Sequence, residues 1–170
     1  MSRRQRIIPV LRDLNPCIGA EVGVYQGTFT ETLLAETGVE CLYCVDWWNG
    51  EGMVRPYNGN ITFATTLVRL IPYWGRVRVM RTHSLNAARE LAADGIKLDF
   101  AYIDADHSEA GALADFRAWA PLIRPGGIIA GDDYKNGMRR GVKAAVNEYF
   151  DGQTINTTGG RCENWWVTIG

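Results

Sequence analysis

The feature that most constrains the fold of this chain is a regular alternation of two kinds of segment. Short apolar runs rich in β-branched residues, typical of buried strands, alternate with longer segments whose apolar residues recur every three or four positions, as on one face of a helix. Repeated strand–helix units build a mostly parallel sheet. The predicted strands are Cys17–Val24, Cys41–Asp46, Arg76–Arg81, Leu98–Asp104, Gly127–Asp132, Gln153–Thr157 and Trp165–Ile169. The predicted helices are Arg4–Leu14, Thr28–Glu36, Ile61–Ile71, Ser84–Ala93, Glu109–Leu122 and Met138–Phe150.

Local patterns near the fifth predicted strand add detail. The sequence Pro125-Gly126-Gly127 indicates a sharp turn from helix to strand. In the helix before it, the apolar positions are expected to face the sheet and Asp115 to face away from it.

Composition and charge indicate one globular unit with a local binding site. The chain has 170 residues, 46% of them hydrophobic, which suits a single domain over residues 1–170 that begins with a short helix within residues 1–16. Its 18 Lys and Arg residues balance 19 Asp and Glu residues, so no general field attracts nucleic acid or an anionic membrane. Pro9 and Arg12 interrupt the opening apolar run too early for a signal peptide, and we expect a cytoplasmic protein.

The segment after the first predicted strand is a candidate ligand loop, because ligands of such sheets bind at the carboxyl ends of the strands. Gly23 and Gly27 allow a close approach to the backbone, and the helix that begins at Thr28 presents free N–H groups. Tyr25 occupies the middle glycine position of a dinucleotide fingerprint, which disfavours a pyrophosphate. The carboxylate of Glu21 suits an ammonium group.

Asp46 ends the second predicted strand, where nucleoside-binding folds place an acid on the ribose hydroxyls. Trp47 and Trp48 follow directly and offer a flat wall for stacking, although either ring would also suit the core.

The strongest pattern in the sequence is a pair of apolar strands that each run into acidic residues. Asp104 and Asp106 follow one strand, Asp132 and Asp133 follow the other, and one helix separates the two. Carboxylates that converge in this way favour a hard divalent cation such as Mg²⁺, Ca²⁺ or Mn²⁺ over zinc. The alternative is that these acids cap helices or pair with Lys135, Arg139 and Arg140.

Asp106 and His107 are the candidate proton acceptors in this cluster. Asp106 is the first choice for a general base, and a lone histidine such as His107 more often has a structural role.

Together these motifs resemble those of class I S-adenosylmethionine-dependent methyltransferases. Within that class, three segments resemble the metal-dependent macrocin and mycinamicin sugar O-methyltransferases: Glu21 to Gly27, Tyr102 to Ser108, and Pro125 to Tyr134. The resemblance implies a three-layer αβα Rossmann-like sandwich with a seven-stranded, mostly parallel sheet and an antiparallel last strand. It also implies S-adenosylmethionine as cofactor, Mg²⁺ or another hard divalent cation, and a small hydroxylated acceptor.

The resemblance further implies the role of each site residue. Asp104, Asp132 and Asp133 correspond to the Mg²⁺ ligands, and Asp106 corresponds to the base, with His107 beside it. The residues expected to line the cofactor are Glu21, Gly23, Tyr25, Gly27, Thr28, Asp46, Trp47, His83, Ser84 and Asp104.

Other functions remain open at this point. A nicotinamide-dependent reductase shares the sheet and the acid at Asp46, and a nucleoside-binding module or inactive partner subunit shares the whole fold. Since few residues precede the first strand, the acceptor pocket is expected to be open, to be covered by residues 47–60, or to be completed by a second copy of the chain.

Overall fold

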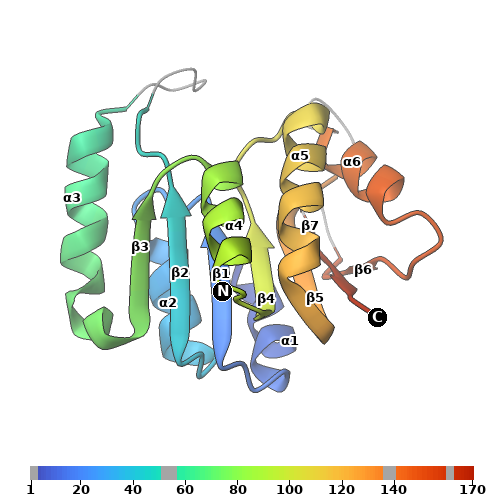
Figure 1. Ribbon diagram of the computed structural model, residues 1–170, viewed down its shortest axis with the longest axis horizontal. Helices are drawn as coiled ribbons and strands as arrows, with labels where there is room; N and C mark the ends of the chain where they lie inside the picture. The colour runs from blue at the N-terminus through green and yellow to red at the C-terminus, as the bar shows by residue number, and fades with distance from the viewer. Residues whose placement is uncertain (1–3, 51–56, 136–140, 160–162) are drawn as a thin grey trace.

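A computed structural model describes residues 4–50, 57–135, 141–159 and 163–170 of the chain. Within these residues seven strands form one sheet, in the order β3-β2-β1-β4-β5-β7-β6 (Figure 1). The strands are β1 Ile18–Val22, β2 Cys41–Asp46, β3 Val77–Arg81, β4 Leu98–Ile103, β5 Ile123–Tyr134, β6 Asn156–Thr157 and β7 Glu163–Thr168.

The sheet has the mixed direction that the sequence predicts. Strands β1 to β5 are all parallel to one another, whereas β7 pairs antiparallel with both β5 and β6. The chain passes from β3 at one edge back to β4 beside β1, so the strand order reverses between β1 and β4. The expected Rossmann-like sandwich is therefore confirmed.

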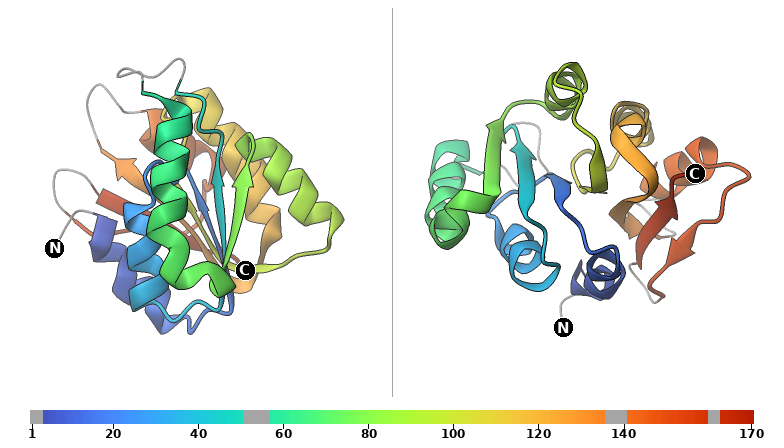
Figure 2. Two further views of the ribbon diagram at one scale, coloured as in Figure 1. Left: turned by 90° about the vertical axis from the view of Figure 1, so that its left-hand side faces the viewer. Right: turned by 60° about the horizontal axis from the view of Figure 1, so that its bottom comes forward.

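Helices cover both faces of the sheet (Figure 2). One face packs against α4 Ser84–Ala93, α5 Glu109–Trp119 and α6 Gly141–Tyr149, around the buried side chains of Phe116 and Trp165. The other face packs against η1 Arg4–Ile7, α1 Ile8–Asp13, α2 Thr28–Glu36 and the end of α3 Gly59–Leu70. In the described part of the chain, no helix has the length and apolarity that crossing a bilayer requires.

The structure differs from the predicted boundaries around β5. Helix α5 ends at Trp119, and a 3-10 turn, η3 Ala120–Leu122, follows because Pro121 lacks the N–H that a longer helix needs. Strand β5 already begins at Ile123, which pairs with Leu98, and the predicted turn at Pro125 is an irregularity within the strand. A second 3-10 turn, η2 Ile71–Arg76, lies between α3 and β3.

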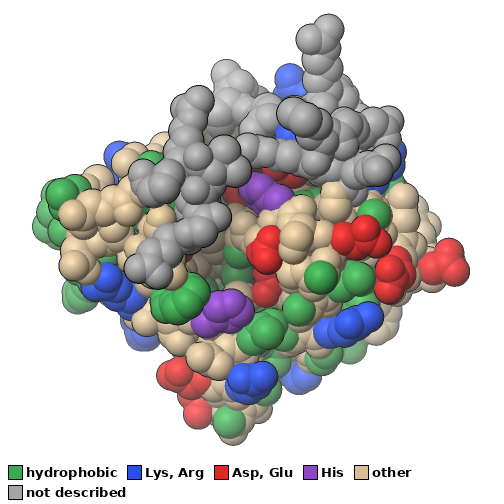
Figure 3. Space-filling view, turned by 90° about the horizontal axis from the view of Figure 1, so that it is seen from above, with side chains coloured by type: hydrophobic (Ala, Val, Ile, Leu, Met, Phe, Trp, Pro, Cys, Tyr) green, Lys and Arg blue, Asp and Glu red, His purple; other side chains and the backbone are tan. Residues whose placement is uncertain are grey.

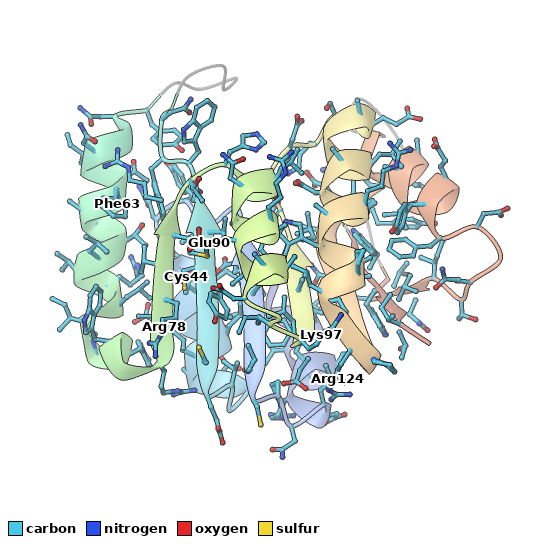
Figure 4. All side chains as sticks on the ribbon, in the orientation of Figure 1. Cys44, Phe63, Arg78, Glu90, Lys97 and Arg124 are labelled. Carbon is cyan, nitrogen blue, oxygen red and sulfur yellow. The ribbon has the colours of Figure 1, made fainter. Side chains whose placement is uncertain are left out.

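One side chain fastens the amino-terminal edge of the sheet. Asp99, at the start of β4, accepts hydrogen bonds from the N–H groups of Cys17 (2.7 Å) and Ile18 (2.8 Å) and pairs with Arg124 Nε on β5 (2.5 Å). Figure 4 labels Arg124 at this lower edge. Burial raises the pKa of Asp99, but the hydrogen bonds from Ile18, Arg124 and Cys17 outweigh burial and hold that pKa below its ordinary value. Asp99 thus joins β1, β4 and β5.

We expect Asp99→Ala to lower the free energy of unfolding by about 2–4 kcal/mol at neutral pH, because it leaves two N–H groups and a guanidinium without their acceptor. Because the folded-state pKa is lowered, this stabilisation is present above the ordinary aspartate pKa and is lost as the pH falls through the folded-state value. Urea unfolding at neutral and acidic pH measures both effects. Asp151→Ala, at an exposed turn, is the control; an equal loss in both variants would contradict the assignment.

Candidate functional site

The candidate site lies at the carboxyl ends of the parallel strands. Figure 3 looks onto this edge and shows both histidine side chains there, with acidic side chains near them. The site residues that the sequence predicts lie in the last residues of β1, β2 and β5, in the loops after β1, β2, β3 and β4, or at the first residue of α2 or α4. The candidate site is therefore built from separate strand ends, loops and helix starts along one edge of the sheet.

Gly23 allows the ends of β1 and β4 to meet. Its φ of 96° lies in the left-handed region, and a Cβ placed on it would lie 2.1 Å from the carbonyl oxygen of Asp104. The Gly23 N–H donates to Val45 O (2.9 Å), and the Asp104 N–H donates to Val22 O (2.8 Å). The absence of a side chain at Gly23 thus brings the first loop directly against Asp104.

Asp46 connects the loops that follow β1 and β2. Its Oδ2 accepts a hydrogen bond from the Tyr25 N–H (2.8 Å), and its Oδ1 accepts one from the Trp48 N–H (2.7 Å). The Tyr25 carbonyl in turn accepts from Trp48 Nε1 and Thr66 Oγ1, both at 2.7 Å. Asp46 therefore has a structural role in addition to the ribose contact predicted for it, which needs the remaining lone pairs of the carboxylate.

The two neighbouring tryptophans have different surroundings. Trp48 is fully buried and packs against Phe63 of α3. Trp47 is 56% exposed and meets the ring of His83 edge to face, with 5.7 Å between centroids. Trp47 and His83 thus form an aromatic wall at the edge of the site, whereas Trp48 belongs to the core.

The other predicted residues of the first loop are arranged around the start of α2. Gly27 is the N-cap of this helix, Thr28 is its exposed first residue, and Tyr25 is 45% exposed beside the loop. Glu21 is almost fully buried, and its Oε2 accepts a hydrogen bond from Thr30 Oγ1 (2.5 Å). The Glu21 carboxylate therefore lies beneath the loop rather than on its surface.

Ser84 has buried partners instead of an open position. Its Oγ donates to Asp115 Oδ1 (2.5 Å) and accepts from Trp119 Nε1 (2.8 Å). The N-cap of α4 is His83, whose Nδ1 accepts from the Leu85 N–H (3.3 Å). Asp115, expected to face away from the sheet, is buried where α5 meets Ser84 of α4.

His107 links the two acidic strand ends. Its Nε2 lies 3.0 Å from Asp104 Oδ1, and its Nδ1 lies 3.6 Å from Asp133 Oδ2. Lys135 Nζ lies 2.5 Å from the other oxygen of Asp133. The structure therefore brings Asp104, His107 and Asp133 together, with the imidazole between the two carboxylates and Lys135 on the other oxygen of Asp133.

The three predicted metal ligands do not converge on one point in this arrangement. Asp132 and Asp133 contact different side chains: Asp133 lies beside His107 and Lys135, whereas Asp132 lies beside Asn164. Asp132 Oδ1 lies 3.4 Å from Asn164 Nδ2, which also donates to the hydroxyl of buried Tyr102. Among the described residues, no group of three or more His, Cys, Asp or Glu side chains is placed to hold a metal ion. As placed, these side chains do not fit the predicted Mg²⁺ site.

Asp106 is exposed, and a local turn fixes its direction. Its Oδ1 accepts a hydrogen bond from the Ser108 N–H (2.8 Å), and Ser108 is the N-cap of α5. Its other oxygen lies against Gly111, where an added Cβ would be 2.2 Å away. Asp106 thus presents an oriented carboxylate at the edge of the site.

Sequence reasoning missed several side chains that shape this edge. Asp115 and Asn164 are buried polar residues, although the sequence predicted that Asp115 faces away from the sheet and that the last strand begins after Asn164. The side chains of Ser84, Asp115 and Trp119 can all form hydrogen bonds, but the sequence does not show that they bond to one another. That pairing requires α4 to lie beside α5. The sequence gave no sign of the hydrogen bond from Thr66 to the Tyr25 carbonyl, because this bond forms only when α3 packs beside the first loop.

Comparison with known proteins defines the family. A family model described as a methyltransferase domain matches residues 20–134. Since this match covers more than half of the chain, the protein belongs to that family and is a class I S-adenosylmethionine-dependent methyltransferase. A search of curated proteins found no match.

Solved structures share the fold at low sequence identity. An O-methyltransferase from Bacillus cereus, solved with SAH, is 17% identical with a TM-score of 0.74, over 99% of this chain and 82% of that one. CalS11, a TDP-rhamnose 3'-O-methyltransferase of calicheamicin biosynthesis, is 18% identical with a TM-score of 0.71, over 96% and 77%. A Clostridium thermocellum protein proposed as an rRNA methylase is 13% identical with a TM-score of 0.74, over 100% and 97%. These likenesses show the fold.

We expect Gly23→Ala to weaken SAH binding at least tenfold and to destabilise the protein by about 2–4 kcal/mol, because the new Cβ strains the backbone and displaces the Asp104 carbonyl. Calorimetric titration with SAH and urea unfolding measure the two effects. Gly38→Ala is the matched control, since Gly38 also has a positive φ of 79° but nothing within 4 Å of its Cβ position. Equal effects of the two substitutions would show that the contact with Asp104 is unimportant.

Proposed function

We propose that the protein transfers the methyl group of S-adenosylmethionine to a hydroxyl oxygen of a small molecule. The observation that carries this proposal is the position of Asp104, His107 and Asp133, which lie together directly beside the loop that Gly23 forms. A group of acidic and basic side chains beside a cofactor loop suits the handling of a proton on a neutral acceptor.

The first three loops fit the cofactor that the family uses. Asp46, held between the two loops, is proposed to face the ribose hydroxyls, and the exposed ring of Trp47 beside His83 is proposed to border the adenine. Glu21, Gly23, Tyr25, Gly27, Thr28 and Asp104 are proposed to surround the methionine part. When bound, S-adenosylmethionine supplies a methyl group on a positively charged sulfur.

Asp106 is proposed as the base that receives the proton of the acceptor hydroxyl. Its carboxylate is exposed to an incoming molecule, and the Ser108 N–H keeps it in one orientation. His107 is proposed to hold Asp104 and Asp133 in place. Orientation and the exclusion of water should supply most of the rate acceleration, because the methyl group is already activated.

A small acceptor is favoured over nucleic acid by the charge of the chain. The net charge is −1, whereas binding a phosphate backbone depends on an excess of Lys and Arg side chains at the surface. Among the fold neighbours, CalS11 acts on a nucleotide-linked sugar. A sugar or catechol hydroxyl is therefore the proposed acceptor class.

The direct test is methyl transfer from S-adenosylmethionine to a panel of sugars, sugar nucleotides and catechols, with SAH formation as the readout. We expect SAH to bind the protein and at least one hydroxylated acceptor to be turned over. Binding without any turnover would point to a nucleoside-binding module, and stabilisation by NADH in place of SAH would point to a reductase.

Dependence on a divalent cation is a separate proposal, which comes from the family resemblance. It predicts that EDTA abolishes turnover, that Mg²⁺ restores it, and that Asp132→Ala prevents this restoration. Turnover that survives EDTA would instead favour the arrangement described above, in which Lys135 and His107 contact Asp133.

Replacement of Asp106 tests the proposed base. Asp106→Asn keeps an oxygen that can accept from the Ser108 N–H, and its amide has the same shape against Gly111. We therefore expect an unchanged fold and SAH affinity, and a kcat lowered by about 10²–10⁴ because the base is lost. The comparison variant is His107→Gln. Full activity of Asp106→Asn together with loss of activity in His107→Gln would assign the base to His107.

A further inference from the structure

A buried carboxylate lies directly beneath the loop that follows β3. Asp115 on α5 is only 4% exposed, and its Oδ1 accepts the Ser84 hydroxyl from α4 at 2.5 Å. Ser84 Oγ accepts in turn from Trp119 Nε1 at 2.8 Å, and Trp119 is fully buried. The three side chains form one directed chain of hydrogen bonds between α4 and α5.

The surroundings of Asp115 disfavour its ionised form. Burial raises the pKa of Asp115 to about 6, the nearby Asp106 also raises it, and the Ser84 hydrogen bond and His83 oppose the rise. These two, His83 on the α4 side and Asp106 in the loop before α5, are the charged or titratable groups that act on it among the described residues. A neutral side chain would avoid the desolvation cost.

The partners of Asp115 connect it to the cofactor site. Ser84 is the first residue of α4, and its neighbour His83 is the N-cap of that helix. The His83 ring contacts the exposed ring of Trp47 from the loop after β2. A displacement of Ser84 therefore moves one side of the aromatic wall.

We propose that Asp115 is a positioning residue, whose carboxylate fixes the turn at His83 and Ser84 and thereby sets the affinity for the adenosine half of the cofactor. This inference rests on the proposed function, because that proposal places the adenine beside His83. The Asp115 carboxylate accepts the Ser84 hydroxyl, and it acts on the turn through that hydrogen bond.

The protonation state of Asp115 decides the direction of the hydrogen-bond chain. An ionised Asp115 only accepts, so the Ser84 hydroxyl points to it while accepting from Trp119. A protonated Asp115 can donate instead, and Ser84 then faces two donors and must turn its own hydrogen elsewhere. The hydrogen bond that fixes the turn at His83 and Ser84 should therefore be lost as the pH falls through about 6.

The experiment measures SAH affinity by calorimetry between pH 5 and pH 8, with thermal unfolding of the ligand-free protein at each pH. The variants are Asp115→Asn, Ser84→Ala and the conservative Ser84→Thr; the control is Asp94→Asn, an exposed acid at the other end of α4. We expect wild-type affinity to fall below pH 6 and the control to follow it. We expect Asp115→Asn and Ser84→Ala to bind SAH roughly tenfold more weakly at pH 7.5 and to lose most of this pH dependence, and Ser84→Thr to recover it.

Thermal unfolding separates positioning from a merely structural role. Because the folded-state pKa of Asp115 is raised, its ionised form destabilises the fold above pH 6, and Asp115→Asn should not lower the melting temperature at pH 7.5. The inference is overturned if both variants keep the wild-type SAH affinity and pH profile, or if affinity falls only together with the melting temperature. Failure of the wild-type protein itself to bind SAH would instead overturn the proposed function.

Discussion

The close contact between the Gly23 loop and the Asp104 carbonyl is the constraint on which the site depends. Only a residue without a side chain permits it, and it occurs where the strand order reverses between β1 and β4. The contact places two loops from distant parts of the sequence within hydrogen-bonding distance. Asp46 then joins the loop after β2 to the loop after β1, because it accepts hydrogen bonds from the N–H groups of Trp48 and Tyr25. The loops of the candidate site are therefore held together by backbone contacts and by the hydrogen bonds that the Asp46 carboxylate accepts.

The sequence predicted the strands and helices well because their apolar periods reflect burial on a sheet face or a helix face. It also predicted that the candidate residues lie at one edge of the sheet, because they follow or end the predicted parallel strands. It did not predict that Asp46 accepts hydrogen bonds from the N–H groups of Tyr25 and Trp48, both of which have positive φ values. Nor did it predict the different partners of Asp132 and Asp133, since the sequence does not show that Asn164 lies beside one carboxylate and His107 beside the other.

Buried or half-buried charges at the site occur in linked groups. Asp104 and Asp133 face the same imidazole, and Lys135 neutralises the second carboxylate. The Asp115 carboxylate lies beneath the loop after β3 and accepts the hydroxyl of Ser84. Each group has its polar atoms oriented before any ligand arrives, and such preorganisation lowers the cost of arranging dipoles during a reaction.

The Asp99 clamp at the opposite edge of the sheet divides the molecule into two regions with different tolerance to change. Asp99 joins three strands at the edge away from the candidate site, so this contact does not depend on the identity of the loop residues. Loop substitutions that leave the Gly23 contact and the Asp46 hydrogen bonds in place can therefore accumulate over evolution while the sheet stays intact. A scaffold of this kind is suited to acquiring new acceptor preferences, and it offers engineers a base on which loops can be exchanged.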